Sequence, residues 1–290
     1  MWPRSLLGKI SSPQTQKLTA GELKVELDAE IAREKISRMM LAMEDRGGIE
    51  EFIAAMSAKQ TLFAELLDRQ RLAELTQDEL HVLIDTMFTA RRNLMNGLAG
   101  ISHENLVAGM QALLFAERSV EERLTEFVAL SMLGDQDRSA KRKSQRAMWD
   151  FAAEMLHFVN PTAMPLMTRW VWDAKVQSGA MREFIRGGDS MSEIAIGATA
   201  DQFEAGRVWL VARLEEQGFY RDIPLMVDLV FAQAYTDYFL GMSKGLGMFD
   251  SQFGGKLEPI DFIVRLLGIS PARKDGKTRV KSSVSNITLQ

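Results

Sequence analysis

Apolar residues recur every three or four positions through almost the whole chain, while the strict alternation that is typical of strands is scarce. Residues 20–43 illustrate this helical spacing with an apolar stripe of Leu23, Leu27, Ile31, Ile36 and Met40. Gly47 and Gly48 follow, and glycine commonly ends a helix. The pattern therefore predicts an all-α fold, a multi-helix globular bundle whose helices cover most of residues 19–267.

Helix starts can be located from residues that cap the first turn. Ser119 followed by Glu122 has the form of a capping box, and Thr199 followed by Gln202 repeats it. Thr76 and Ser102 are further candidate N-caps, so we expect about four to six helices in the first half. In the second half the pattern predicts helices over residues 147–158, 165–176, 179–186, 199–217, 223–240 and 259–267.

The periodicity is interrupted at residues 133–146, which are polar, contain a glycine and have no apolar stripe. We interpret this segment as a basic linker loop between two helical subdomains. The N-terminal subdomain covers residues 19–132, and the C-terminal one covers residues 147–269 with an aromatic and charged core. The two ends of the chain lack an apolar stripe. We therefore expect residues 1–18 to be a flexible N-terminus and residues 270–290 to be a basic flexible tail.

Composition narrows the class of protein. The 290 residues are 46% hydrophobic and 26% charged, which is the balance of a well-packed globular chain. No window approaches the roughly 20 uncharged apolar residues of a membrane span, so we expect no integral membrane association. The sequence has no cysteine, which excludes disulfides, thiolate metal sites and thiol nucleophiles. We therefore expect a cytoplasmic protein.

Basic residues are clustered although the net charge of the chain is -4. One cluster, here called the basic patch, consists of Lys141, Arg142, Lys143 and Arg146, and a second cluster lies in the tail. A solvated loop and a phosphate-binding site both explain such a patch. Neither cluster contains the interleaved aromatic residues that stack on bases, so binding to nucleic acid is the weaker expectation.

The supply of histidines limits metal chemistry. Of the three histidines, His157 alone stands three residues after a glutamate, Glu154. A ferritin-like di-iron site needs two such pairs on different helices, so we expect no metal site. Asp150, Glu154 and His157 share one helical face, here called the candidate polar face. Proton transfer or weak metal binding is one interpretation of this face, and a solvated surface opposite the apolar residues of the helix is the other.

The next segment combines helix breakers with aromatic and charged residues: His157-Phe-Val-Asn-Pro161, then Pro165-Leu-Met-Thr-Arg-Trp-Val-Trp-Asp173. The residue before a proline is held extended, and a proline suits the first turn of a new helix. This segment resembles the helix, Asn-Pro, helix, Asp stretch of helix-hairpin-helix DNA glycosylase-like proteins. The resemblance is confined to residues 157–173, because the glycine-rich hairpin that binds phosphate in that family has no match in the chain.

Residues 148–240 hold four of the five tryptophans and all three tyrosines, and charged residues lie among them. In the expected helix over residues 165–176, Arg169 and Asp173 are four apart and can pair, and Trp172 can stack on Arg169. In the expected helix over residues 223–240, the most apolar of those predicted, Asp228 and Tyr235 share a face. We expect a buried Asp228 to need an internal partner, which is Arg169 or, as alternatives, Arg221 or Arg207.

Arg169, Trp172, Asp173, Asp228 and Tyr235 together form the candidate ligand pocket. Structural ion pairing explains this set, but arginine beside a buried acid and aromatic rings also describes a site for an anionic, planar ligand. An open polar cavity beside Arg169 would favour the ligand, and a closed, fully paired cluster would favour a structural role.

The leading hypothesis is a non-catalytic helical accessory or assembly protein that acts by protein–protein interaction. It rests on the helical pattern and on the lack of nucleophile, phosphate or cofactor motifs, and it implies a protein partner and no cofactor. The alternative is an all-α enzyme or small-molecule binder that uses the candidate ligand pocket. A weaker alternative is a nucleic-acid-binding protein that uses the basic patch and the tail.

Overall fold

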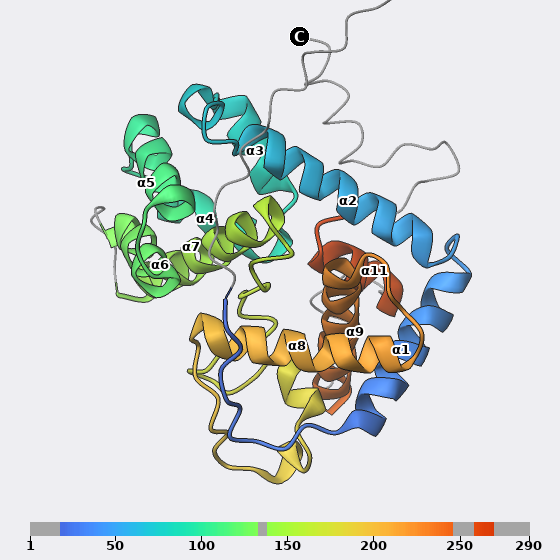
Figure 1. The fold of residues 1–290 in the computed structure, drawn as a ribbon. Coiled ribbons are helices and arrows are strands. Elements are labelled where there is room, and N and C mark those ends of the chain that lie inside the picture. The colour runs from blue at the N-terminus through green and yellow to red at the C-terminus, as the bar shows by residue number, and fades with distance from the viewer. Residues whose placement is uncertain (1–17, 133–137, 246–257, 270–290) are drawn as a thin grey trace, which may run out of the picture.

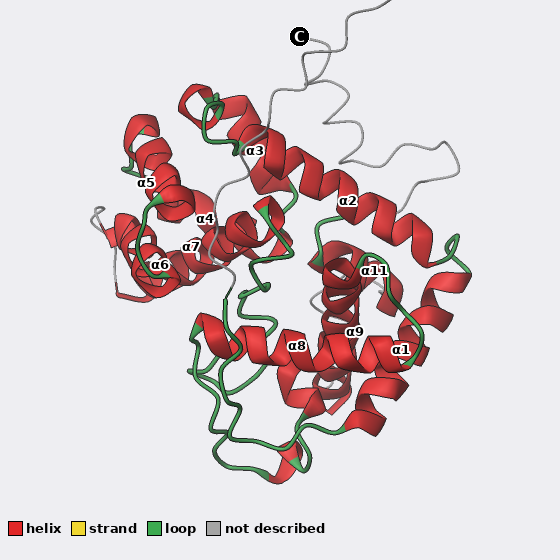
Figure 2. Cartoon of the chain, in the orientation of Figure 1, coloured by secondary structure: helices red, strands yellow, loops and turns green. Residues whose placement is uncertain are grey.

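The computed structural model describes residues 18–132, 138–245 and 258–269. Over these residues the protein is all-α, as the apolar spacing predicts (Figure 2). Within the same ranges, pairing between extended segments is limited to two isolated bridges, Leu27 with Ile185 and Asp173 with Ser178. No helix in the described parts of the chain is long and apolar enough to cross a membrane.

The first helices follow one another closely along the chain: α1 Ala29–Glu44, α2 Ile49–Leu66, α3 Gln77–Asp85, α4 Phe88–Leu98, α5 His103–Phe115 and α6 Val120–Ala129. The later helices are α7 Arg138–Val159, α8 Ala200–Glu216, α9 Ile223–Gly245 and α11 Pro259–Leu266. Short 3-10 turns are η1 Leu72–Glu74, η2 Leu130–Met132, η3 Ala180–Phe184 and η4 Gly188–Ser190.

α9 lies at the centre of the C-terminal part of the fold. Figure 1 shows it behind α8 and beside α11, and it also packs against α1, α2 and η3. Apolar side chains occur on every side of α9, so residues 225–234 are buried all round. α7 plays the corresponding part for the N-terminal helices, because it packs against α2, α4, α5 and α6.

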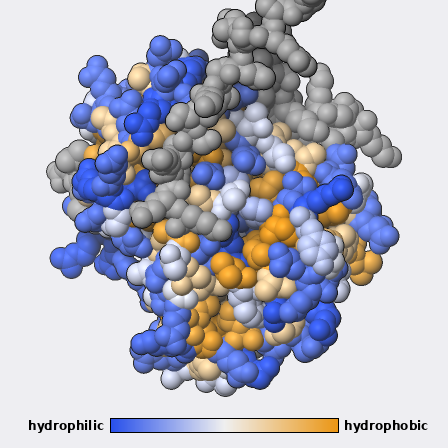
Figure 3. Space-filling view, in the orientation of Figure 1, coloured by the Kyte–Doolittle hydropathy of each residue, from blue (hydrophilic) through white to orange (hydrophobic). Residues whose placement is uncertain are grey.

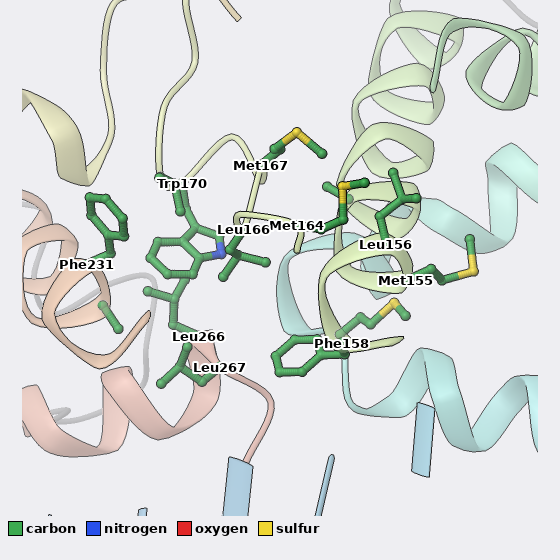
Figure 4. Close-up of a cluster of buried hydrophobic side chains, with 14 of the residues drawn as sticks. Met155, Leu156, Phe158, Met164, Leu166, Met167, Trp170, Phe231, Leu266 and Leu267 are labelled. Atoms are coloured by element: carbon green, nitrogen blue, oxygen red, sulfur yellow. The ribbon is translucent and has the colours of Figure 1, made fainter. Parts of the chain in front are cut away.

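The apolar core is continuous from α7 to α9. Figure 4 shows Phe158 of α7, Trp170 of the segment after it, Phe231 of α9 and Leu266 of α11 around the same cluster. Methionines fill the space between these larger side chains, as adaptable residues do in irregular cores: Met155, Met164 and Met167. The segment between α7 and α8 is therefore as much a part of the core as the helices are.

Most of the predicted helix starts are confirmed. Thr76 and Ser119 form complete capping boxes with Glu79 and Glu122, and the Ser102 hydroxyl accepts a hydrogen bond from the backbone nitrogen of Asn105. Thr199 is the N-cap residue of α8, but its side chain makes no cap bond, so the capping box predicted there is wrong. The Gln202 side chain instead accepts from the backbone nitrogen of Gly197 at 2.6 Å.

The first helix begins later than the apolar spacing predicts. Asp28 is its N-cap, and its carboxylate accepts from the backbone nitrogen of Glu30 at 2.9 Å. Residues 18–28 run without helix against the later chain, where Gly21 N donates to Asp201 O and Asp28 N donates to Phe184 O, both at 2.8 Å. The predicted flexible ends lie outside the described residues, except for Leu18, which packs partly buried against the core.

The predicted basic linker loop is wrong from Arg138 onward, because α7 begins there, and residues 133–137 lie outside the described residues. The inward side of this first part of α7 is small rather than apolar, which hides its periodicity. Ser144 is buried against Gly97 of α4, whose missing side chain lets the two helices approach closely. The division into two subdomains stays a prediction.

The helix predicted over residues 165–176 does not form, and that over 179–186 is reduced to the 3-10 turn η3. Side chains of α7 satisfy the backbone of this segment instead, since Trp149 Nε1 donates to Met167 O at 2.8 Å. A tight turn follows, in which Asp173 N donates to Ser178 O at 2.8 Å. In the opposite direction, α9 is longer than predicted and ends at Gly245.

Candidate functional site

Arg169 is bound to Asp150, which the sequence placed in a different candidate site. Its guanidinium Nη2 lies 2.7 Å from Asp150 Oδ2, and its backbone nitrogen donates to Asp150 Oδ1 at 2.9 Å. Asp173 Oδ2 lies 3.8 Å from the guanidinium Nη1, so the expected ion pair with Asp173 is also present. Arg169 thus lies between two carboxylates, while its Nε is buried without a hydrogen-bond partner.

Burial is the largest cause of the pKa shifts of two groups near Arg169, Asp150 and Tyr235. It raises the pKa of the Asp150 carboxyl, an effect that the charge and hydrogen bonds of Arg169 oppose. Burial also raises the pKa of Tyr235, and the neighbouring Tyr238 adds to this effect. The Tyr235 ring packs at 6.0 Å from the Trp170 ring. The structure therefore brings Arg169, Asp173 and Tyr235 of the candidate ligand pocket together with Asp150.

The other two residues of the candidate ligand pocket have separate surroundings. Trp172, expected to stack on Arg169, is buried and donates its indole nitrogen to Ile196 O at 3.2 Å. Asp228 does not pair with Arg169, Arg207 or Arg221 in the structure. Its partner is His157, whose Nε2 lies 2.8 Å from Asp228 Oδ2. The set predicted from the sequence is therefore divided between two neighbouring ion pairs and the contact of Trp172.

The candidate polar face is buried, so its interpretation as a solvated surface is wrong. Asp150, Glu154 and His157 are all 1% or 2% exposed. A helical spacing of polar residues predicts a shared face but not its neighbours, and here that face is covered by α2, α9 and the segment after α7. Each of the three side chains consequently has a partner inside the protein.

His157 has an oxygen atom at each of its ring nitrogens. Nδ1 lies 2.8 Å from Met164 O, and a carbonyl can only accept, so Nδ1 carries a proton. The 2.8 Å contact between Nε2 and Asp228 Oδ2 then needs one further proton, held by one atom or the other. The buried pair therefore holds either an imidazolium with a carboxylate or a neutral imidazole with a carboxylic acid.

Lys59 of α2 completes the buried polar network, and the sequence analysis missed it. Its ammonium has three acceptors, Glu154 Oε2 at 2.7 Å, Leu267 O at 2.8 Å and Thr86 O at 3.0 Å. Thr86 and Leu267 are the C-cap residues of α3 and α11, where unpaired carbonyls and the helix dipoles favour a positive charge. The lysine thus joins the ends of two helices to the side of α7.

A sequence signal for Lys59 exists. The lysine occupies a position in the middle of the apolar stripe of α2, which otherwise consists of Phe52, Ala55, Met56, Leu62, Phe63 and Leu66. Burial lowers the pKa of Lys59 and raises that of Glu154, while the attraction between the two groups opposes both shifts. Charged residues at buried-stripe positions are therefore the places where internal pairing should be expected.

The side chains of the network are closed off from solvent. Lys59, Glu154, His157 and Asp228 are buried and spend their hydrogen bonds mainly on one another and on backbone carbonyls. Within the described residues, no group of three or more His, Asp or Glu side chains could hold a metal ion. The geometry fits a stabilising role, in which the ion pairs hold α2, α7, α9 and α11 in one arrangement.

The basic patch lies on the outer side of the first turns of α7. Arg142, Lys143 and Arg146 are exposed, and Lys141 is half-buried. Arg146 Nη2 lies 4.0 Å from Asp173 Oδ2, which links the patch to the surroundings of Arg169. The patch is a helical surface rather than a loop, and the sequence expectation of a solvated basic segment agrees with its exposure.

α8 differs from an ordinary surface helix at two places, because it buries an ion pair among its apolar core residues and exposes the apolar Val208. Glu204 and Arg207 are both buried and joined by two hydrogen bonds of 2.7 Å, and Arg207 also donates to Thr162 O at 3.0 Å. On the outer side Val208 is 46% exposed. Figure 3 shows apolar surface over the region where Figure 1 places this helix. The sequence analysis predicted the helix but not this inversion.

Comparison with protein-family models, with curated proteins and with solved structures gives no match for this chain. The local resemblance of residues 157–173 to helix-hairpin-helix glycosylase-like proteins also loses its second helix, because Pro165 begins none. The function has to be argued from the geometry alone.

Proposed function

We propose that this protein is a non-catalytic helical accessory or assembly protein that acts by binding another protein, and that it binds through the outer side of α8. This surface, here called the α8 face, consists of Ala205, Val208, Trp209 and Ala212. The single observation that carries the proposal is a second apolar stripe on α8, on the side opposite its buried residues. Trp209 forms the edge of this stripe, because its ring also packs against Phe184 of the core.

The apolar residues of the α8 face have the spacing of a helix that packs on both of its sides. Positions 205, 208, 209 and 212 follow the pattern i, i+3, i+4, i+7, and each of them is at least partly exposed. The opposite side of α8 packs on the core through Phe203, Leu210 and Leu214. An apolar stripe in contact with water has a free-energy cost that a partner helix or groove would remove.

The state of the buried ion pairs supports the same proposal. Arg169 is neutralised by Asp150 and Asp173, and the Lys59 and His157 groups are paired inside the core. Groups paired in this way stabilise a scaffold. Arg169 Nε has no hydrogen-bond partner, but it is buried, so an anionic ligand would have to open the surrounding structure to reach it. These pairs therefore favour a function at the surface over one at the candidate ligand pocket.

The test places a charge on the α8 face. A photoreactive amino acid at position 208 should cross-link a defined partner in cells, and the purified partner should lose at least tenfold in affinity for Val208→Glu. The control is Leu41→Glu on α1, because Leu41 is even more exposed, at 69%, and lies outside the α8 face. The proposal fails if both variants bind every identified partner as the wild type does, with folding of both checked by circular dichroism.

A further inference from the structure

The α8 face is narrow and its ends are acidic. Ala205 and Ala212 flank the larger Val208 and Trp209, and small residues let a second helix approach closely. Asp201 precedes Ala205 by one turn, and Glu215 follows Ala212 by three residues, both exposed. Fourteen positions of helix separate these two acids, which is about 21 Å at the rise of an α-helix.

The neighbouring basic residues do not neutralise these ends. Arg213 is bound to Glu216, with its Nη2 at 2.5 Å from Glu216 Oε1, and it stacks over the Trp209 ring at 5.8 Å. Arg207 is buried in its pair with Glu204. The α8 face therefore presents a narrow apolar centre, with the paired Arg213 at its Trp209 edge, and a negative charge beyond each end.

A second copy of this chain fits the α8 face poorly. If two copies packed antiparallel about a twofold axis at Val208, Asp201 of one copy would lie opposite Glu215 of the other. If they packed parallel, each acid would face the same acid of the other copy. Like charges placed opposite each other disfavour both arrangements. A complementary surface has instead an apolar centre and positive ends.

We propose that the α8 face receives an amphipathic helix of another protein, with a narrow apolar stripe and a lysine or arginine beyond each end of that stripe. This inference rests on the proposed function, because it specifies the partner for the same surface. In such a complex the apolar stripes pack against each other, while Asp201 and Glu215 attract the basic residues and fix the register.

The experiment compares two designed helical peptides that share one apolar stripe. One carries lysine about fourteen positions apart, beyond each end of the stripe, and the other carries glutamate there. Binding to the full chain is measured by fluorescence anisotropy. We expect the lysine peptide to bind at least tenfold more tightly, to lose this advantage at high salt, and to lose binding to Val208→Glu but not to Leu41→Glu.

A separate double variant tests the contribution of the two acidic residues. Asp201→Asn combined with Glu215→Gln should remove most of the preference for lysine over glutamate while leaving the apolar contribution. Equal binding of the two peptides to the wild type would overturn the inference. If Val208→Glu nevertheless abolishes binding of a natural partner, the proposed function stands although this inference fails. If neither peptides nor partners respond to that variant, both fail.

Two other occupants would also overturn the inference. Concentration-dependent dimers in sedimentation velocity that disappear in Val208→Glu would identify a second copy as the occupant. The basic tail of the chain is the other candidate. If replacing Arg273, Lys274 and Lys277 by glutamate in the full chain raised the affinity of the lysine peptide tenfold or more, the tail would be the occupant of the wild type.

Discussion

Lys59 shows how one charged side chain is kept inside an apolar core. Its ammonium donates to Glu154 and to the carbonyls of Thr86 and Leu267, and it lies 4.1 Å from the centre of the Phe158 ring. Every proton of the group has an acceptor, so the cost of burial is offset by three hydrogen bonds and an ion pair. A neutral residue of similar size would leave two helix ends unsatisfied.

We expect Lys59→Met to destabilise the protein by about 3 to 5 kcal/mol, because it leaves the buried Glu154 and two carbonyls without a donor. Adding Glu154→Leu should recover part of this loss, since the unpaired carboxyl is then removed. Arg46→Met is the control, because Arg46 makes exposed ion pairs with Glu258 and Asp261, worth about 0 to 1 kcal/mol. Urea unfolding measures all three; equal effects for Lys59 and Arg46 would contradict the prediction.

Glu154 should make the stability depend on pH. Its pKa is raised by burial above the ordinary value of 4.5, so the folded state holds the proton more strongly than the unfolded state does. The resulting contribution is fully present below pH 4.5 and is lost as the pH rises through the folded pKa. The stability of the wild type relative to Glu154→Gln should therefore fall above pH 4.5 in urea unfolding at several pH values. A constant or rising difference would refute this direction.

His157 and Asp228 allow a test of the shared proton. Since Met164 O holds the proton on Nδ1, a neutral ring presents Nε2 as an acceptor, and the amide of Asp228→Asn can donate to it. We expect Asp228→Asn to cost about 1 kcal/mol, whereas Asp228→Ala, which leaves Nε2 unpaired, should cost about 3 kcal/mol. Thermal unfolding of both variants is the measurement. Equal losses of stability would show that the hydrogen bond at Nε2 does not decide how well a substitution of Asp228 is tolerated.

At the scale of elements, the ends of two helices meet the middle of a third. Gly268 follows Leu267, the C-cap residue of α11; its φ is +68°, and its missing side chain allows the Thr86 carbonyl to lie close. A Cβ built at Gly268 would lie 1.5 Å from that oxygen, which is also an acceptor of Lys59. The end of α11, the end of α3 and the middle of α2 therefore meet at one point.

Gly268→Ala should separate these helix ends. The change combines a left-handed backbone with a direct collision, so we expect a loss well above 2 kcal/mol. Gly218→Ala is the matched control, because Gly218 has a φ of +86° but nothing within 4 Å of a new Cβ. Its cost should be limited to the backbone term of about 1 to 2 kcal/mol. The two variants are compared by urea unfolding, and equal losses would exclude a contribution from the close contact.

At the scale of the whole molecule, the buried polar pairs connect helices that are distant in sequence. Lys59 joins α2 to α7 and α11, the His157 pair joins α7 to α9, and Lys35 of α1 bonds Glu183 and Asp237 at 2.8 Å each. These pairs lie within or beside one continuous apolar core. Separate unfolding of the two predicted subdomains would have to break this core.

We therefore expect one cooperative unfolding transition. Four tryptophans lie between residues 149 and 209, so their fluorescence reports on the C-terminal half, whereas far-ultraviolet circular dichroism reports on all helices. The two transitions should coincide in urea. Two separated midpoints would instead support the division into residues 19–132 and 147–269.

The sequence by itself determined the fold class, most helix starts and the all-round apolarity of α9, because helical spacing and caps such as Ser119 with Glu122 are local properties of the chain. It also named Asp150, Glu154, His157, Arg169 and Asp228 as candidate site residues. The tertiary structure alone decided which of them pair, that the segment with Arg169 is not a helix, and that α8 buries Glu204 and exposes Val208. Periodicity places side chains on a shared face, but only long-range packing determines whether that face meets water, an opposite charge or the core.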